Sequence, residues 1–211
     1  MLVPERTLGK RSLHRLHSTA MQRIRRRRGG GSPIVGVISD THGLLRPEAI
    51  AALEGVDAII HAGDIGSAEI LDALRRIAPV VAVRGNNDRD AWAAALPEIA
   101  RTQIGATRIC VVHDLEELGE DPARAGVDVV ISGHSHRPRI ERREGLLLLN
   151  PGSAGPRRFS LPVAVARLHL APAGPRAEIV ELAVAGPARR PRARRRRGLD
   201  GARGPGAVSV R

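Results

Sequence analysis

The sequence predicts a single layered α/β domain with mixed sheets, on three observations. From residue 34 onward, short runs rich in Val and Ile alternate with helical or loop segments, which is the pattern of strands buried between layers. The first five runs are separated by such segments, whereas the last three follow one another at short spacing. A chain of 211 residues is also long enough to bury a core without disulfides.

Strands and helices can be assigned in order along this domain. We predict strands over residues 34–39, 58–61, 80–84, 108–113, 127–132, 146–149, 163–170 and 177–182. The helix predicted over 47–53 has Pro47 near its start, where proline is favoured. The helix predicted over 67–77 opens with Ser67 as a capping residue and ends before Pro79.

The net charge of +12 is concentrated at the two ends of the chain. Residues 1–32 hold nine Lys or Arg against one Glu, and residues 187–211 hold nine Arg against one Asp. Such arginine runs repel themselves and bury no apolar surface. We therefore predict a disordered basic N-terminal extension over 1–32, a folded domain over 33–184 and a disordered Arg-rich tail over 185–211.

The cysteine content and hydropathy restrict the class of protein. Cys110 is the only cysteine and lies in an apolar run, which excludes a disulfide framework and a cysteine-based zinc site. No stretch approaches the roughly 18 to 20 continuous apolar residues of a membrane span, and the N-terminus lacks the apolar region of a secretory signal. We expect a cytoplasmic protein with no membrane partner, and the sequence leaves open whether it forms a homo-oligomer.

Nearly every predicted strand ends in a polar residue that can bind a metal. The ends read Ser-Asp-Thr-His-Gly at 39–43, Gly-Asp at 63–64, Gly-Asn-Asn-Asp at 85–88, His-Asp at 113–114 and Gly-His-Ser-His at 133–136. The carboxyl ends of neighbouring strands in an open α/β sheet converge on a shared crevice. We therefore expect these side chains to meet at one edge of the fold.

The spacing within these motifs favours a site for two metal ions. Asp40 and His42 are two residues apart, so at an extended strand end they point to the same side, and His134 and His136 repeat that spacing. Asp64 has two carboxylate oxygens, which can bridge cations held about 3.5 to 4 Å apart. A mixture of imidazole, carboxylate and amide ligands favours Mn, Fe, Co, Ni or Zn over Mg or Ca.

Each motif alone has a simpler explanation. A lone Asp-x-His is most often an ordinary loop, and a polar residue after a strand marks where a loop begins. Here, however, five separate strand ends each supply a residue type that binds metals, and they use five of the eight histidines when His61 is included. Ordinary loop beginnings explain this coincidence poorly. We therefore interpret the set as a metal site.

The order of these motifs, followed by Asn-Pro-Gly-Ser at 150–153, resembles that of the calcineurin-like metallophosphoesterases, in particular the small bacterial and archaeal phosphodiesterases. The resemblance covers about residues 33–182 and implies a four-layer α/β/β/α sandwich with two mixed β-sheets. It also implies two divalent transition metal ions, Mn²⁺ first, with Ni²⁺, Fe²⁺, Co²⁺ or Zn²⁺ as alternatives. One ion would be held by Asp40, His42, Asp64 and His136, and the other by Asp64, Asn86, His113 and His134.

The activity implied by the resemblance is hydrolysis of a small phosphate ester, most simply a phosphodiester. Two cations lower the pKa of a bridging water and polarise the phosphoryl oxygens that it attacks in line. Many relatives have His directly after the metal-binding Asn, whereas Asn87 stands here, and an amide can donate a hydrogen bond but cannot deliver a proton. We expect Asn87, Asp64 and His134 to take part in catalysis.

Several other polar residues have two interpretations each. His61, which is matched in many relatives, either orients a ligand or is a satisfied core histidine. Asp88 and Asp114 are either carboxylates that support the ligands or ordinary turn residues. Arg157 and Arg158 either meet a substrate phosphate or lie in a solvated loop. No role is assigned to the three remaining histidines, His14, His17 and His169.

Two other functions compete with the hydrolase. A eukaryotic retromer subunit resembles the same fold but has lost part of the catalytic set, so a non-catalytic metal-binding scaffold is one alternative, supported only by the change at Asn87. A nuclease that binds nucleic acid through its basic ends is the other. Those ends have no aromatic residues for stacking, and an unpatterned Arg run gives only salt-sensitive, nonspecific attraction.

Overall fold

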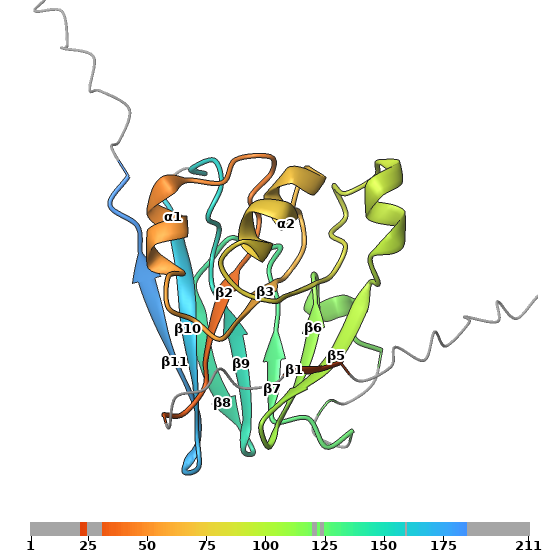
Figure 1. Ribbon diagram of the computed structural model, residues 1–211. Coiled ribbons are helices and arrows are strands. Elements are labelled where there is room, and N and C mark those ends of the chain that lie inside the picture. Colours follow the sequence, from red (N-terminus) through yellow and green to blue (C-terminus); the bar gives the residue numbers. More distant parts are fainter. Residues whose placement is uncertain (1–21, 25–30, 120–121, 123–124, 159, 185–211) are drawn as a thin grey trace, which may run out of the picture.

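The computed structural model describes residues 22–24, 31–119, 122, 125–158 and 160–184. They form two β-sheets that pack face to face, with helices α1 (Pro47–Ala52) and α2 (Ala68–Arg75) on the outside (Figure 1). Pro47 lies in the first turn of α1, and Ser67 occupies the N-cap of α2 without a side-chain capping hydrogen bond. The predicted α/β fold with two mixed sheets is confirmed.

The sheet next to the helices, called sheet I, has the strand order β11-β10-β2-β3-β4. Three of its strands are parallel: β2 (Ile34–Ile38), β3 (Ala58–His61) and the edge strand β4 (Val80–Ala82). The hairpin of β10 (Ala164–Ala171) and β11 (Gly174–Glu181) adds to β2 in the antiparallel sense. β3 is buried along its whole length, as expected for an apolar strand between two layers.

The second sheet, called sheet II, has the strand order β1-β5-β6-β7-β9-β8. Its strands are β1 (Gln22–Ile24), β5 (Ile99–Ile104), β6 (Thr107–Val112), β7 (Val129–Ile131), β8 (Arg139–Arg143) and β9 (Leu146–Asn150). Strands β6, β7 and β9 are parallel, and the two antiparallel pairs are β5 with β6 and β8 with β9.

Buried apolar side chains fill the spaces between the layers. Val37 and Ile60 of sheet I meet Val111 and Ile131 of sheet II in the central core. A second core joins α1 and α2 to sheet I, and a smaller third one covers the outer face of sheet II. Cys110 is buried in this third core, as predicted for a small apolar residue. The outer layer there is thin, with the 3-10 turn η2 (Leu115–Glu117) as its only regular element among the described residues.

Three strands were not predicted. β5 was missed although its residues alternate between buried and more exposed positions, and β8 was missed because nearly all of its residues are charged and exposed. β1 lies within residues 1–32, which were expected to be disordered, and pairs in parallel with β5. The rest of the two basic ends, apart from residues 31–32, lies outside the described residues. None of the helices described is long and apolar enough to cross a membrane.

Candidate metal centre

The loops after β2, β3 and β7 carry predicted ligands in an uncommon backbone conformation. Six described residues other than glycine have positive φ, and five of them are predicted ligands: Asp40 (54°), His42 (45°), Asp64 (55°), His134 (64°) and His136 (57°). Such a conformation costs on the order of 1–3 kcal/mol per residue and is typically maintained by the surrounding structure at functional sites. The backbone strain of this domain is therefore concentrated at the edge where the strands end.

Two glycines allow the ligand loops to lie directly on the carboxylates. A Cβ atom on Gly85 would lie 2.2 Å from both the backbone N and the Oδ1 of Asp64. A Cβ atom on Gly133 would lie 2.0 Å from Oγ of Ser39 and 2.9 Å from Oδ2 of Asp40. Only glycine fits at either position, because any side chain would displace the ligands.

Asp40, His42 and His136 form the first group of ligand atoms. Asp40 is fully buried, and its Oδ2 accepts a hydrogen bond of 2.7 Å from Oγ of Ser39. Its Oδ1 has no hydrogen-bond partner among the described residues and lies 3.3 Å from Nε2 of His136 and 4.0 Å from Nε2 of His42. The two Nε2 atoms are 3.4 Å apart, so all three ligand atoms are within reach of one cation.

Asp64, Asn86, His113 and His134 form the second group. Nε2 of His113 lies 3.1 Å from Oδ1 of Asn86 and 3.4 Å from Oδ2 of Asp64. Nδ1 of His134 lies 3.2 Å from the same Asn86 oxygen. Oδ2 of Asp64 is also 3.8 Å from Nε2 of His42. Asp64 therefore lies between the two groups, in the position that a shared carboxylate needs.

The far side of the His113 ring determines where its proton lies. Nδ1 of His113 is 2.7 Å from the carbonyl oxygen of Ala62, which can only accept, so Nδ1 carries hydrogen and donates. In the neutral ring Nε2 then presents a lone pair to the oxygens of Asn86 and Asp64. Acceptor atoms that face one another in a buried site need a cation or a proton between them.

The charges of the buried groups follow from this arrangement. Burial raises the pKa of Asp40 to about 6, although the Ser39 hydrogen bond opposes the shift. Burial alone would also raise the pKa of Asp64, but hydrogen bonds from His113 and Asn87 outweigh it and hold that pKa below its usual value. Burial lowers the pKa of His113, yet its hydrogen bonds to Asp64 and Ala62 prevail and raise it to about 9. A metal ion at Nε2 of His113 would therefore have to displace a proton.

Asn87, predicted to be catalytic, makes two hydrogen bonds to Asp64. Its backbone N–H donates to Oδ1 at 2.9 Å, and its side-chain amide donates to Oδ2 at 2.6 Å. One of the two amide hydrogens is thereby engaged by Asp64. In this arrangement Asn87 holds the central carboxylate in place.

The other two acidic candidates, Asp88 and Asp114, have different partners in the structure. The Asp88 carboxylate accepts backbone N–H groups of Ile65, Gly66 and Gly85 at 2.8 to 3.1 Å, and so joins the loops after β3 and β4. Oδ2 of Asp114 lies 3.5 Å from Nε2 of His134, where it can orient that ring.

His61 lies behind the ligand loops and is fully buried. Its Nε2 is 2.9 Å from Oγ1 of Thr41, and that hydroxyl donates to the carbonyl of Ile65 at 2.8 Å, so Nε2 of His61 donates to the hydroxyl. Burial lowers the pKa of His61 to about 3, which keeps the ring neutral. This contact fits an orienting role, because Thr41 lies between the candidate ligands Asp40 and His42 in the sequence.

The remaining arginine and histidine candidates lie at different distances from the site. Nη2 of Arg158 lies 3.5 Å from Nε2 of His42, whereas no hydrogen bond or ion pair of the Arg157 side chain is found in the described part of the chain. His169 pairs with Glu178 at 3.2 Å, away from the site. His14 and His17 lie outside the described residues.

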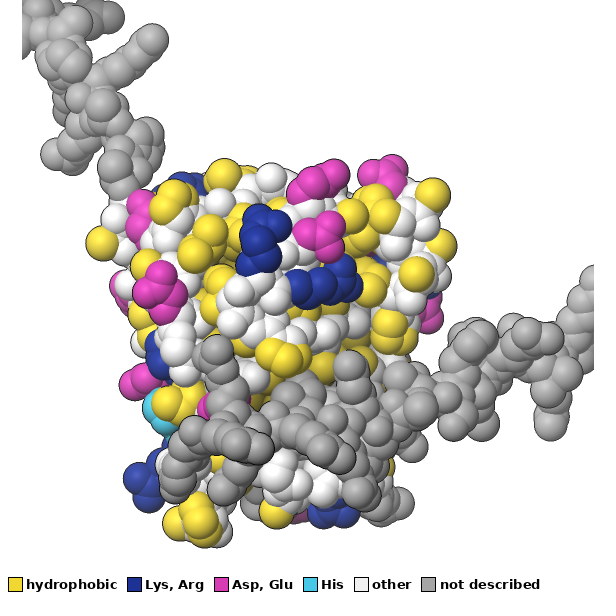
Figure 2. All heavy atoms as spheres, in the orientation of Figure 1, with side chains coloured by type: hydrophobic (Ala, Val, Ile, Leu, Met, Phe, Trp, Pro, Cys, Tyr) yellow, Lys and Arg dark blue, Asp and Glu magenta, His cyan; other side chains and the backbone are white. Residues whose placement is uncertain are grey.

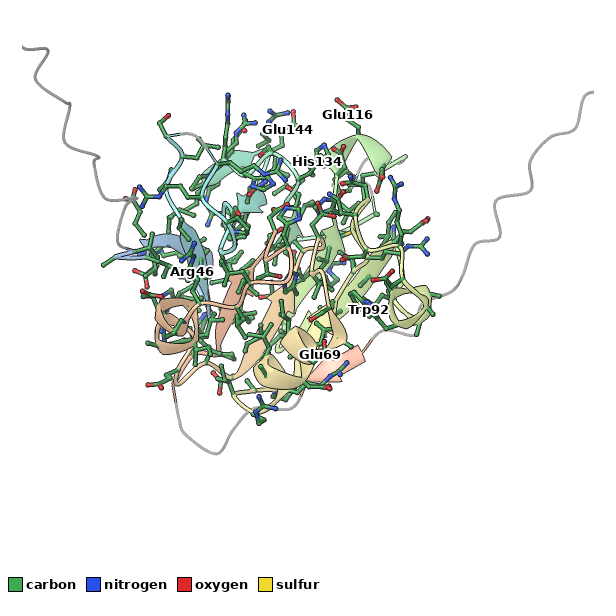
Figure 3. All side chains as sticks on the ribbon, turned by 90° about the horizontal axis from the view of Figure 1, so that it is seen from above. Arg46, Glu69, Trp92, Glu116, His134 and Glu144 are labelled. Atoms are coloured by element: carbon green, nitrogen blue, oxygen red, sulfur yellow. The ribbon has the colours of Figure 1, made fainter. Side chains whose placement is uncertain are left out.

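Two hollows adjoin the second group of ligands. One of about 380 Å³ is lined by Asn86 together with Arg84 and Arg89, and another of about 330 Å³ is lined by His134 together with Leu148 and Leu149. In Figure 3, which looks onto the upper end of Figure 1, His134 lies on the side of Glu116, whereas Glu69 of α2 lies on the opposite side. His134 therefore lies away from α2.

A family model for the calcineurin-like phosphoesterase superfamily domain matches residues 34–172. The chain belongs to this superfamily. A probable metallophosphoesterase of Methanocaldococcus jannaschii is 42% identical to this phosphoesterase over 140 residues, which cover 59% of this chain and 69% of that protein. A phosphodiesterase of the same organism is 28% identical over 137 residues, which cover 56% and 82%.

Solved structures place this phosphoesterase in the same fold. An archaeal phosphodiesterase aligns with a TM-score of 0.60 at 24% identity, over 70% of this chain and 99% of that one. Vps29 of Entamoeba histolytica, solved in complex with Zn²⁺, aligns with a TM-score of 0.54 at 25% identity, over 70% and 98%. The family model and the relatives together make this phosphoesterase a metal-dependent hydrolase.

Proposed function

We propose that this phosphoesterase is a phosphodiesterase that works with two divalent transition metal ions, Mn²⁺ first. One observation carries the proposal: the side chains of all seven predicted ligands gather in two adjoining groups with Asp64 between them. Five separate strand ends contribute to these groups. The seven are Asp40, His42, Asp64, Asn86, His113, His134 and His136.

The donor set fits a pair of such ions. Oδ1 of Asp40 is buried without a hydrogen-bond partner among the described residues. Once the proton on Nε2 of His113 is displaced, that nitrogen offers a lone pair beside the oxygens of Asn86 and Asp64. Each group combines imidazole nitrogen with carboxylate or amide oxygen, the mixture that Mn, Fe, Co, Ni and Zn accept. Apolar packing alone would leave these polar atoms unsatisfied.

When bound, the ions would lower the pKa of a water molecule and polarise the phosphoryl oxygens. The protein side chains around the site hold the candidate ligands in position for this chemistry. Ser39 holds Asp40, Asn87 holds Asp64, and the Ala62 carbonyl fixes the tautomer of His113. Preorganised groups of this kind lower the barrier because they need not reorganise during the reaction.

A diester is favoured over a monoester by the shape around the site. The hollows at Asn86 and His134 lie beside ligands of the second group, so a phosphorus atom at the ligands has space on two sides for organic groups. The hollow at His134 has leucine side chains in its lining, which suits an apolar ester group.

The proposal is tested by metal content and hydrolysis together. The metal-depleted wild type should bind about two equivalents of Mn²⁺ and hydrolyse bis(4-nitrophenyl) phosphate when reloaded. Asp64→Asn should lower the rate by at least about 100-fold and weaken metal binding, because the shared carboxylate loses charge and one acceptor oxygen. Asp72→Asn, an exposed carboxylate that pairs with Arg75 on α2, is the matched control and should behave like wild type. An Asp64→Asn variant as active as wild type would contradict the proposal.

A non-catalytic metal-binding scaffold is the second candidate, because Asn87 is engaged by Asp64 and Vps29 proteins share the fold. A scaffold would bind Mn²⁺ yet leave the diester intact, so the same assay separates the two functions. The nuclease alternative depends on the basic ends, most of which lie outside the described residues. On the face shown in Figure 2, the Lys and Arg side chains drawn in dark blue are scattered among apolar and acidic ones.

A further inference from the structure

The loop after β9 brings a positive charge to the first group of ligands. Nη2 of Arg158 lies 3.5 Å from Nε2 of His42, a nitrogen that is itself 3.8 Å from Oδ2 of Asp64.

The segment that carries Arg158 is anchored to the ligand loop. Oγ of Ser153 donates to the carbonyl of Asp40 at 3.0 Å. A Cβ atom on Gly155 would lie 2.3 Å from the carbonyl oxygen of Thr41, so the two backbones are in close contact. Arg158 follows three residues later, and its presence beside His42 is therefore set by packed backbone.

The contact with His42 leaves the guanidinium group without an anionic partner. Arg158 is exposed, and no carboxylate of the described residues forms an ion pair with it. The lone pair of His42 that it faces is the one a metal ion would take, so both cations cannot use it together. A guanidinium group and a metal ion repel each other unless an anion lies between them. The planar guanidinium can donate two parallel hydrogen bonds to two oxygens of a phosphoryl group.

We propose that Arg158 binds the non-bridging oxygens of the phosphoryl group, and so recognises substrate and product from the His42 side of the site. This role rests on the proposed function, because it needs the metal-loaded site. Arg158 would make the site selective for tetrahedral oxyanions. The organic groups of the substrate would then lie in the two hollows at Asn86 and His134.

The test measures binding of inorganic phosphate to the Mn²⁺-loaded protein by calorimetry. Arg158→Gln should weaken phosphate binding by about 10- to 100-fold, the loss expected for one charged hydrogen-bonding pair. Arg158→Lys should fall in between, because it keeps the charge but loses the fork. Arg157→Gln removes the same charge one residue away and should match wild type.

Binding of Mn²⁺ to the metal-free variants supplies a second readout. Arg158→Gln should bind Mn²⁺ as tightly as wild type or more tightly, since a cation has been removed, and its melting temperature should not fall. Unchanged phosphate binding in Arg158→Gln would overturn the inference and leave the phosphodiesterase proposal intact. Weaker Mn²⁺ binding in this variant would also overturn it, by assigning Arg158 to the structure of the site. A wild type that binds no Mn²⁺ would overturn the proposed function, and this inference with it.

Discussion

At the scale of single residues, the site depends on how a few buried atoms share protons. Asp64 accepts two hydrogen bonds from Asn87 and lies 3.4 Å from His113, so its negative charge is strongly stabilised. Asp40 and His113 instead have raised pKa values, about 6 and about 9. A metal ion bound by these candidate ligands would displace the protons that they hold.

We expect Asn87 to limit which leaving groups the site can expel. We expect the wild type to be slow on esters with poor leaving groups and faster on activated aryl esters, because an amide cannot deliver a proton. Asn87→His should raise the rate on alkyl esters by about 10- to 100-fold, within the range of general acid catalysis. Rates on an alkyl and an aryl diester check this. Unchanged rates on both would show that position 87 has no part in protonating the leaving oxygen.

His113 should make metal binding depend on pH. Its pKa in the folded metal-free protein, about 9, lies above the ordinary value of 6.5, so below pH 9 the ring holds a proton that a metal ion must remove. The apparent Mn²⁺ affinity should therefore rise with pH up to about 9. Near pH 7.5 binding should release about one proton, as measured by calorimetry in buffers of different ionisation enthalpy. Binding without proton release would contradict the arrangement at His113.

At the scale of elements, the parallel strands place the ligands and the loops bend them into contact. β2, β3 and β4 end at the same edge of sheet I, and β6 and β7 end at the matching edge of sheet II. Motifs far apart in the sequence therefore meet at this edge. The close approach of their loops also requires glycine at positions 85 and 133.

Gly133 provides a direct test of that packing. Gly133→Ala should lower the free energy of unfolding by about 1–3 kcal/mol and weaken metal binding, because the new Cβ would overlap Oγ of Ser39 and crowd Asp40. Gly119→Ala is the control, since a Cβ there has no atom within 4 Å. Urea unfolding and Mn²⁺ titration of both variants measure the difference. Equal stability would mean that the loop after β7 relaxes freely.

At the scale of the whole molecule, we expect metal binding and folding to be linked. The strained loops that carry the candidate ligands lie where both sheets end, so a bound ion would stabilise contacts between the sheets. At a free concentration of about 100 times Kd, one bound ion stabilises the folded state by about 2.7 kcal/mol. At constant pH, chelation should lower the melting temperature by about 5–10 °C for each ion lost. A melting temperature unaffected by chelation would contradict a preformed site for metal ions.

The sequence was sufficient for the α/β class, for most of the buried strands and for the set of candidate ligands. Buried strands such as β3 and β6 are apolar enough to be recognised locally, and ligand motifs follow them directly. β1 and β8 could not be recognised in this way, because edge strands form through backbone pairing and need no apolar pattern.

Contacts across the sheets required the tertiary structure. Three such contacts join residues far apart in the chain. The Asn87 amide bonds to Asp64, the Ala62 carbonyl fixes the His113 ring, and Arg158 lies against His42. The sequence shows which chemical groups follow each strand. Their distances, tautomers and pKa values depend on the packing of one loop against another, and that packing is decided only when the two sheets come together.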